Sequence, residues 1–564
     1  MKEKEVFVTS TAQAGFVDKP PIELPHPVRM RVLFMVMIGV FLAALDQTVV
    51  GTALPRIITD LGGNDLYTWA FTAYLLTSTI SGPLYGKLSD LFGRRPIFLF
   101  GIGIFMVGSL LAGLSQEMWH LIGARGIQGL GAGALFPIAL AVIGDLFSPS
   151  ERGRYQGLFG AVFGLSVLIG PAIGGLLTDT IGWPFVFFFN LPIGAVVFVV
   201  VWRNLPAYHL GGDRPSIDYI GAALFTAALV PILIGLTNKQ GADWTDPTVG
   251  GLIVLGAIIG LVFLFAESRA REPIVPLELF RIRSFTISVA AFFLASFGFL
   301  AAVVFLPRWF QVVNGSSATE SGYQILPLLG GLIISATAAG QIVARTGRYR
   351  ILMIGALLMM AAGLWLLTNL RADTPIPLVW LWMFITGIGV GPSFAVFTLI
   401  VQNSVPVERL GAATSNLTFF QSVGGTIGLA ITGTIFGTTL AEEAPRQLAS
   451  ANLPPELTAA AGSGFHPGAA TAVGDLGAAI LAQVPEAFRA QVEPFIPAIV
   501  DAIHQAVSIA TASTFAIGVA ASLLAALLVT GLKEAPMRAE ESAGGGDRRP
   551  ERVSADRALA EPGA

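Results

Sequence analysis

The chain has 564 residues, of which 54% are hydrophobic and only 12% are charged, and its mean hydropathy is +0.72. A water-soluble fold of this length could not bury so much apolar surface, so the composition predicts an all-α integral membrane protein. The net charge of −3 and the absence of a basic patch with interleaved aromatic residues argue against a nucleic-acid partner. Because the chain has no cysteine, disulfides, thiolate metal sites and cysteine nucleophiles are excluded.

The first 31 residues predict a cytoplasmic tail. They mix charged residues with proline, and the apolar segment that follows, 32–54, is too long for the core of a cleavable signal. Fourteen apolar segments of membrane-crossing length follow, since about 20 residues cross the hydrocarbon core of a bilayer. They start near Val32, Leu66, Pro96, Met118, Tyr155, Trp183, Asp218, Thr248, Ser284, Ser321, Ile351, Pro377, Leu410 and Ser508.

The distribution of lysine and arginine predicts the orientation of these segments. With both termini in the cytoplasm, 26 of the 33 basic residues fall in cytoplasmic segments and 6 on the outer side. Short basic loops stay in the cytoplasm, so both termini are expected there.

The predicted domains follow from the same segments. They are the tail 1–31, a six-helix bundle 32–205, a linker 206–270 with two inserted transmembrane helices, a second six-helix bundle 271–532 and a disordered cytoplasmic tail 533–564. The second bundle contains a long outer loop, 438–506. The sequence is compatible with two alternatives for it, a helical hairpin over the outer vestibule and a loosely ordered spacer.

One loop between two apolar segments combines glycine with charge. Residues 86–95 read GKLSDLFGRR, and the two glycines permit a sharp turn with close backbone approach. Lys87, Arg94 and Arg95 place the loop on the cytoplasmic side. Asp90 is an acid in a basic turn, and it therefore needs a specific partner.

The same pattern occurs again in the second half of the chain. Residues 340–349 read GQIVARTGRY, so that Gly340, Gly347 and Arg348 correspond to residues 86, 93 and 94, while Ala344 replaces the acid. Two six-helix halves related by such a repeat are typical of transporters with a binding site between paired bundles.

The loop at 86–95 resembles the signature cytoplasmic loop of the major facilitator superfamily, and the count of segments resembles its fourteen-helix drug:proton antiporter branch. Three further fragments strengthen this resemblance: Leu45–Ile57 in the first segment, Arg125–Gly133 in the fourth, and GPAIGG at 170–175 in the fifth. The resemblance implies the major facilitator fold with two six-helix bundles and two inserted helices. It also implies an antiporter motif formed by Gly170, Pro171, Gly174 and Gly175, and the three glycines are expected to let a neighbouring helix pack closely.

Two charged residues lie inside the predicted membrane core. Asp46 is near the middle of the first segment, where an ionised acid costs about 2.5–3.5 kcal/mol. Asp46 is therefore a candidate proton carrier, and the resemblance implies that Arg125 responds to its charge. The alternatives are a permanently protonated or salt-bridged acid that holds helices together and an arginine in a static pair.

The resemblance also implies a conformational latch at the cytoplasmic side. Asp145 is expected to reach Arg94 or Arg95, and Asp90 is expected to face the positive N-terminal end of a helix near 410–413. A solvated ion-pair cluster of little energetic value is the alternative. The latch residues are Gly86, Asp90, Gly93, Arg94, Arg95 and Asp145.

The resemblance also implies a substrate cavity between the two bundles. Aromatic and amide side chains suit planar, cationic or neutral lipophilic molecules. The alternative for each aromatic residue is that it packs helices or faces lipid. The candidates are Gln128, Phe136, Phe163, Phe293, Phe297, Asn416, Phe420 and Gln421.

The sequence predicts no enzyme, cofactor or metal site. The five histidines are scattered outside the centres of the segments, and no phosphate-binding GxxxxGK[ST] occurs. The predicted function is proton-coupled export of lipophilic small molecules by a monomer in a bacterial-type plasma membrane. Its alternatives are proton-coupled export of one endogenous metabolite, lipid or peptide, and a receptor or channel built on a transporter fold.

Overall fold

The computed structural model describes residues 24–61, 67–147, 149–205, 218–239, 242–270, 273, 275–316, 318–406, 409–451, 476–483, 489 and 492–534. Within these residues all regular secondary structure is helical. The predicted tails at 1–31 and 533–564 lie mostly outside the described residues.

The first half of the chain forms one group of packed helices. These are α1 (His26–Leu61), α2 (Tyr67–Phe92), α3 (Arg94–Gly113), α4 (Met118–Leu146), α5 (Pro149–Thr180), α6 (Pro184–Phe188) and α7 (Asn190–Asn204). Apolar residues of α1, α3, α4 and α7 share one buried core. The predicted sixth segment is interrupted between α6 and α7, and Asn190 begins the second piece.

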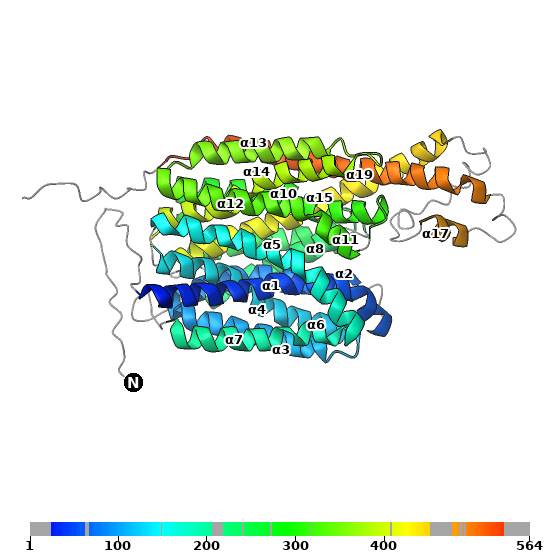
Figure 1. Ribbon diagram of the computed structural model, residues 1–564. Coiled ribbons are helices and arrows are strands. Elements are labelled where there is room, and N and C mark those ends of the chain that lie inside the picture. The colour runs from blue at the N-terminus through cyan, green and yellow to red at the C-terminus, as the bar shows by residue number, and fades with distance from the viewer. Residues whose placement is uncertain are drawn as a thin grey trace, which may run out of the picture.

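The second half forms a separate group with its own core. Its helices are α10 (Arg283–Val312), α11 (Ala318–Gln324), α12 (Leu326–Thr346), α13 (Arg350–Leu367), α14 (Ile376–Ser404), α15 (Leu410–Ser450), α17 (Leu476–Gln483) and α19 (Ile496–Val529). A short helical turn, η3 (Leu277–Arg281), precedes α10, and another, η6 (Glu493–Phe495), precedes α19. Figure 1 shows the two groups side by side, with α5 and α12 adjacent between them. The halves also meet where α2 packs against α15, and α5 contacts α14 as well as α12.

The length and composition of the helices identify the candidates for crossing a membrane. Twelve helices of the described residues are long and apolar enough to cross a membrane. The two remaining long helices, α2 with 26 residues and α5 with 32, pack among them. The predicted total of fourteen and the predicted orientation remain predictions.

The two inserted helices cover one interface between the halves. α8 (Tyr219–Asn238) packs against α9 (Leu252–Glu267), which follows the short helical turn η2 (Pro247–Gly251). α8 also contacts α2 and α15. The ring of Phe225 in α8 lies 5.5 Å from that of Phe263 in α9 and 5.3 Å from that of Phe419 in α15. The inserted pair is therefore bound to both halves along the α2–α15 interface.

The expected outer loop at 438–506 is partly helical instead. α15 continues to Ser450 and α19 begins at Ile496, so that both ends of the predicted loop are extensions of these helices. Leu440, Ala444 and Leu448 repeat every fourth residue on α15, and they share a buried core with Ile503 and Val507 of α19. This favours the helical hairpin over the spacer, and Figure 1 shows the pair projecting beyond the other helices. Residues 452–475 lie outside the described residues.

Candidate functional site

Asp46 lies at the centre of a buried polar cluster between α1 and α4. Its exposed fraction is 2%, and that of Arg125 is zero. Arg125 Nη1 donates a hydrogen bond to Asp46 Oδ2 within a fully buried ion pair. Gln128, one helical turn after Arg125, donates from Nε2 to Asp46 Oδ1 at 2.7 Å and accepts from Arg125 Nη1 at 2.6 Å. Both carboxylate oxygens of Asp46 thus accept hydrogen bonds.

Two residues that the sequence reasoning missed complete this cluster. Asn190 Nδ2 donates to Asp46 Oδ1 at 2.8 Å, and Ser109 Oγ accepts from Gln128 at 2.6 Å and from Asn190 at 3.1 Å. Asn190 begins α7 at the interruption after α6. A polar residue at such a break, between phenylalanines and proline, was the available signal.

One nitrogen of the Arg125 guanidinium group, Nη2, has no acceptor in the part of the chain that the structure describes. Arg125 Nε donates to Ala70 O at 3.3 Å. The guanidinium carbon lies over the ring of Tyr74, 4.2 Å from the ring centroid. Buried Nη2 has no hydrogen-bond partner among the described residues. A buried donor without an acceptor is unfavourable by about 1–3 kcal/mol. When Asp46 loses its charge, a new hydrogen bond from Nη2 would remove this cost, which favours a change in the hydrogen-bond partners of Arg125.

A second charged cluster joins the two halves at the end of the bundle where residues 86–95 and 340–349 lie, here called the basic end. Asp90 of α2 accepts from Gly411 N at 2.9 Å and from Ala412 N at 2.7 Å. These amides belong to the first turn of α15, where the helix dipole favours an anion. The contact expected between Asp90 and residues 410–413 is therefore present.

Arg94 connects this contact to α4. It is fully buried, pairs with Asp90, and donates from Nε to Asp145 Oδ2 at 2.8 Å. The sequence left Arg94 and Arg95 open as the partner of Asp145, and the structure selects Arg94, whereas Arg95 is half-buried. Gly93 precedes α3 with a φ of 91°, which a residue with a side chain rarely adopts. Burial of these charges argues against a solvated surface cluster.

α2 and α15 cross at two glycines beside this cluster. A Cβ on Gly86 would overlap the Ser415 side chain and lie 2.8 Å from Gly411 O. A Cβ on Gly411 would lie 2.7 Å from Gly86 O and overlap the Asp90 and Arg94 side chains. Only glycine permits this approach of the two halves.

We therefore expect Gly411→Val to favour separation of the halves at the basic end. Overpacking commonly costs about 1–3 kcal/mol, which would shift the closed-to-open ratio about 5- to 150-fold. Spin labels at Lys87→Cys and Arg409→Cys would report a longer distance, and the chain has no native cysteine to interfere. Gly103→Val is the control, because a Cβ there has no neighbour within 4 Å. An unchanged distance between the labels in Gly411→Val would show that the close approach of α2 and α15 at this glycine does not hold the halves together.

The halves also meet through contacts of α14 with α4 and α5. Gln402 Nε2 donates to Leu140 O at 3.0 Å. Arg152, which is 4% exposed, donates to Gly144 O at 2.6 Å and to Asn403 Oδ1 at 3.1 Å. The sequence reasoning did not single out these residues. Gln402 and Arg152 thus join the two halves at the basic end as well.

The antiporter motif of α5 packs closely at one of its glycines. A Cβ on Gly170 would overlap the Thr48 side chain of α1, in agreement with the expected close packing. Gly174 is buried, but Gly175 faces open space, so the expectation of close packing is wrong for Gly175. The side chain of Pro171 lies outside the described residues.

The substrate candidates of the first half do not share one environment in the structure. Gln128 is fully buried and its amide is engaged in the Asp46 cluster, which differs from the expected place in a cavity. Phe136 is half-buried against the core of the first half, and the side chain of Phe163 lies outside the described residues.

The candidates of the second half lie on α10 and α15. The rings of Phe293 and Phe297 are 5.4 Å apart, next to α15. Phe420 packs against Phe280 at 5.8 Å, and Gln421 is half-buried. Asn416 is fully buried and donates to Ala412 O at 2.7 Å, but its Oδ1 has no partner among the described residues.

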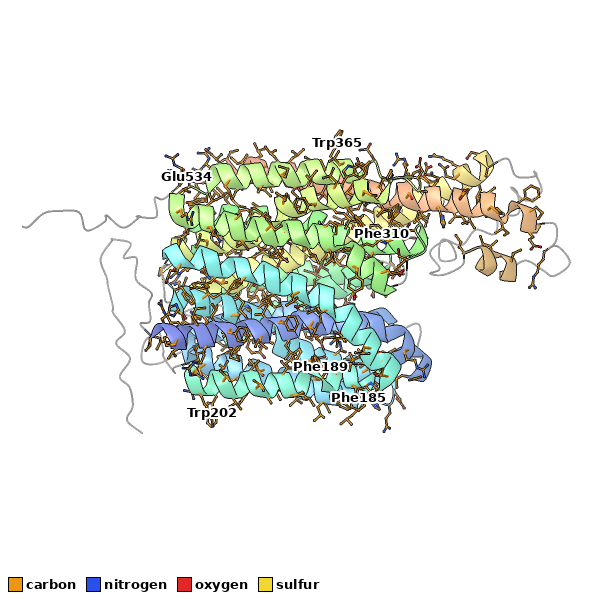
Figure 2. All side chains as sticks on the ribbon, viewed as in Figure 1. Phe185, Phe189, Trp202, Phe310, Trp365 and Glu534 are labelled. Atoms are coloured by element: carbon orange, nitrogen blue, oxygen red, sulfur yellow. The ribbon has the colours of Figure 1, made fainter. Side chains whose placement is uncertain are left out.

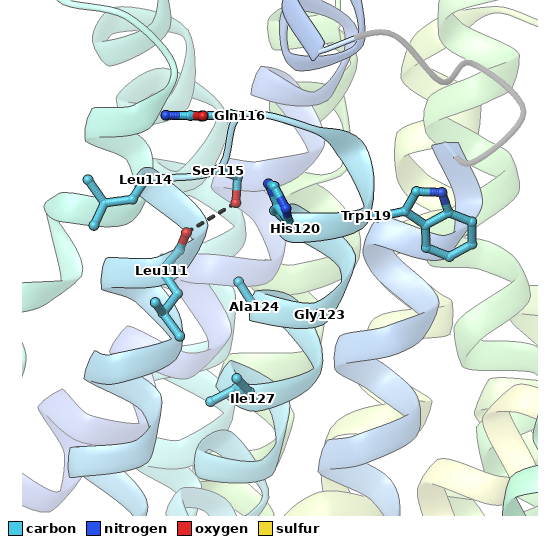
Figure 3. A pocket seen from close by; sticks show the side chains of 9 residues that line it. All are labelled: Leu111, Leu114, Ser115, Gln116, Trp119, His120, Gly123, Ala124 and Ile127. Atoms are coloured by element: carbon cyan, nitrogen blue, oxygen red, sulfur yellow. Dashed lines mark hydrogen bonds between the residues drawn. The ribbon is translucent and has the colours of Figure 1, made fainter.

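A groove of about 530 Å³ lies at the opposite end of α3 and α4 from the basic end. Figure 3 shows Ser115, Gln116 and His120 at one end of it and Ile127 at the other. The exposed fractions of Leu114 and Trp119 are above one half, so the groove opens outward from the bundle. It is separate from the cluster around Asp46.

Comparison with known proteins agrees with this architecture. The sequence profile of the Major Facilitator Superfamily matches residues 36–429. The chain belongs to the major facilitator superfamily. A crystal structure of the human organic anion transporter MFSD10 shares the fold with a TM-score of 0.55 at 16% identity, covering 73% of this chain and 94% of that one.

Two bacterial relatives are more similar in sequence. Multidrug transporter protein MdtP of Bacillus subtilis (strain 168) is 41% identical over 71% of this chain and 74% of that protein. Multidrug resistance protein 3 of the same organism is 36% identical over 72% of this chain and 79% of its own length. This member of the major facilitator superfamily is thus a multi-pass plasma-membrane transporter for small molecules.

Proposed function

We propose that this protein is a proton-coupled multidrug exporter that exchanges protons for lipophilic cations or neutral molecules by alternating access. The observation that supports proton coupling best is the buried cluster of Asp46, Arg125, Gln128 and Asn190. The proton gradient supplies the energy, and the proposal involves no cofactor. The predicted monomer and the cytoplasmic position of the basic end belong to the same proposal.

Protonation of Asp46 changes the contacts of the whole cluster. An ionised carboxylate accepts the hydrogen bonds from Arg125, Gln128 and Asn190, whereas a protonated one loses the attraction of the guanidinium group. Nη2 of Arg125 has no hydrogen-bond partner among the described residues, so a movement that brings it to another acceptor is then energetically favourable. A proton entering at Asp46 therefore alters the α1–α4 contact, and its release restores the ion pair.

The cytoplasmic latch opposes opening of the two halves. Asp90 binds the first turn of α15 while Arg94 ties it to Asp145. These contacts stabilise the state that is closed at the basic end. Substrate binds from the cytoplasm only after they break, and the contacts re-form before release on the outer side.

The residues beside α10 and α15 favour lipophilic substrates. Phe293 and Phe297 offer aromatic faces for stacking or for a cation. Unpartnered Asn416 Oδ1 offers a hydrogen-bond acceptor. Among the described residues, the other buried acids, Asp90, Asp145 and Glu267, lie at helix ends, and Asp46 is the one buried acid near the middle of a membrane helix.

The test combines resistance with ion coupling. An efflux-deficient host producing this protein should survive several unrelated toxic lipophilic compounds. In inverted vesicles, uptake of tetraphenylphosphonium should require a pH gradient and persist when the potential is clamped to zero, because one proton exchanged for one monovalent cation moves no net charge. Protection against no compound of the panel would favour export of a single endogenous molecule, and uptake driven by potential alone would contradict antiport.

A further inference from the structure

The second copy of the repeated loop places its arginine differently from the first. Arg348 corresponds to Arg94, but Arg94 is fully buried and Arg348 is exposed. The partners of Arg94 are lost in the second half, where no acid stands at the corresponding positions. Arg94 contacts Ser89, Asp90 and Asp145. The alignment of the two loops places Val343 and Ala344 at the positions of Ser89 and Asp90. Aligning Pro149 with Pro406 places Gln402 at the position of Asp145.

The loss of these partners leaves a group of cations at one corner of the basic end. Arg345, Arg348 and Arg350 are all exposed. Exposed Lys533 joins them, because Tyr349 Oη donates to Lys533 O at 2.8 Å and so holds the end of α19 against the loop. Four cations from two segments therefore gather there.

An anionic group of the chain already occupies this corner. Glu534 Oε1 accepts a hydrogen bond from Arg350 N at 3.1 Å. Arg350 begins α13, which has 18 residues, and the N-terminus of a helix attracts anions. The exposed carboxylate of Glu534 thus marks a place where a stronger anion that displaces it would meet the Arg350 amide and the guanidinium groups of nearby residues.

The position of the corner matches the level of lipid headgroups. Figure 2 shows Glu534 at the end of the bundle at which Trp202 also lies. Trp202 is 52% exposed at the end of α7, as is typical of a residue at a membrane–water interface. Ile342 and Ile351, which flank the arginines, are 46% and 76% exposed, so apolar side chains facing the bilayer adjoin the cations.

We propose that Arg345, Arg348, Arg350 and Lys533 bind the phosphate of an anionic phospholipid in the adjoining monolayer, in place of the Glu534 carboxylate. The exposed isoleucines contact its acyl chains. The cations act through charge-assisted hydrogen bonds to phosphate oxygens, which arginine makes with two nitrogens at once. This inference does not depend on proton coupling or on the identity of the transported molecule.

The test measures lipid binding to the full chain in a neutral detergent by native mass spectrometry. Wild-type protein should retain phosphatidylglycerol in preference to phosphatidylcholine, and less of it at high salt. Because a basic residue near a membrane surface contributes about 1 kcal/mol, Arg348→Gln with Arg350→Gln should weaken phosphatidylglycerol binding about 30-fold. Glu534→Gln should strengthen it, because the competing carboxylate is lost. Arg371→Gln, at the other end of α13 and also exposed, is the matched control and should bind as wild type.

Three outcomes would overturn the proposal. The first is equal retention of phosphatidylglycerol and phosphatidylcholine by the wild-type protein. The second is an unchanged affinity in the double arginine variant, or an equal loss in Arg371→Gln. The third is displacement of phosphatidylglycerol by an equal concentration of inorganic phosphate, which would show a site for a free anion. Transport activity is not part of the readout, so failure here is distinguishable from failure of the proposed export function.

Discussion

Replacing Asp46 with asparagine should abolish proton-driven efflux in inverted vesicles. The amide cannot exchange a proton in the physiological range, and its NH₂ group would face the donors Gln128, Asn190 or Arg125. We also expect the variant to lose stability, because it leaves Arg125 buried without a counter-charge, at a cost of about 3–5 kcal/mol. Substrate-dependent proton movement and thermal unfolding of the purified protein would measure the two effects separately.

A second variant keeps the functional prediction independent of folding. Asp46→Asn combined with Arg125→Gln removes both buried charges, so the stability should return while transport remains absent. Asp60→Asn at the exposed end of α1, where Asp60 pairs with Arg56, is the matched control and should retain transport. Proton-driven transport of a monovalent cation in either Asp46 variant would exclude Asp46 as the proton carrier.

Arg94→Ala should slow transport strongly while leaving substrate affinity nearly unchanged. The variant removes the group that joins Asp90 to Asp145 and leaves two buried acids without it. The state closed at the basic end is then destabilised by several kcal/mol, since breaking a buried pair costs about 3–5 kcal/mol. Transport should slow because each cycle must pass through this closed state.

The conformational part of this prediction can be measured with a single cysteine. Ser415→Cys places a thiol at the crossing of α2 and α15, where Ser415 is fully buried. A maleimide should label it faster in the Arg94→Ala background than in wild type. Arg95→Ala is the control, because Asp145 pairs with Arg94. Equal labelling in all three proteins would show that Arg94 does not hold the halves together.

The sequence predicted the fold class and the contacts that depend on charge. Few ionisable residues lie within the apolar helices, so Asp46 and Arg125 had few possible partners, and the ion pair between them is present. The contact of Asp90 with residues 410–413 was predictable for a related reason, since a buried acid requires donors and a helix N-terminus provides them.

Neutral residues were harder to place. Gln128 was assigned to a substrate cavity, but it binds Asp46, because spacing along a sequence does not show which neighbour a helix face meets. Asn190 and Ser109 were overlooked, since neither carries charge or belongs to a recognised motif. The helical ends of the outer segment were mistaken for loop, because alanine and small residues there conceal the four-residue spacing of Leu440, Ala444 and Leu448.

The inserted helices give the two interfaces between the halves unequal access from the bilayer. α8 and α9 cover the interface of α2 with α15. There Phe225 of α8 packs against Phe419 of α15, and this packing obstructs lateral access from the bilayer. The interface of α5 with α12 is contacted instead by the short helix α11, which has seven residues. A lipophilic compound that is dissolved in the membrane would therefore meet the long helices α8 and α9 on the α2–α15 side and the seven-residue helix α11 on the α5–α12 side.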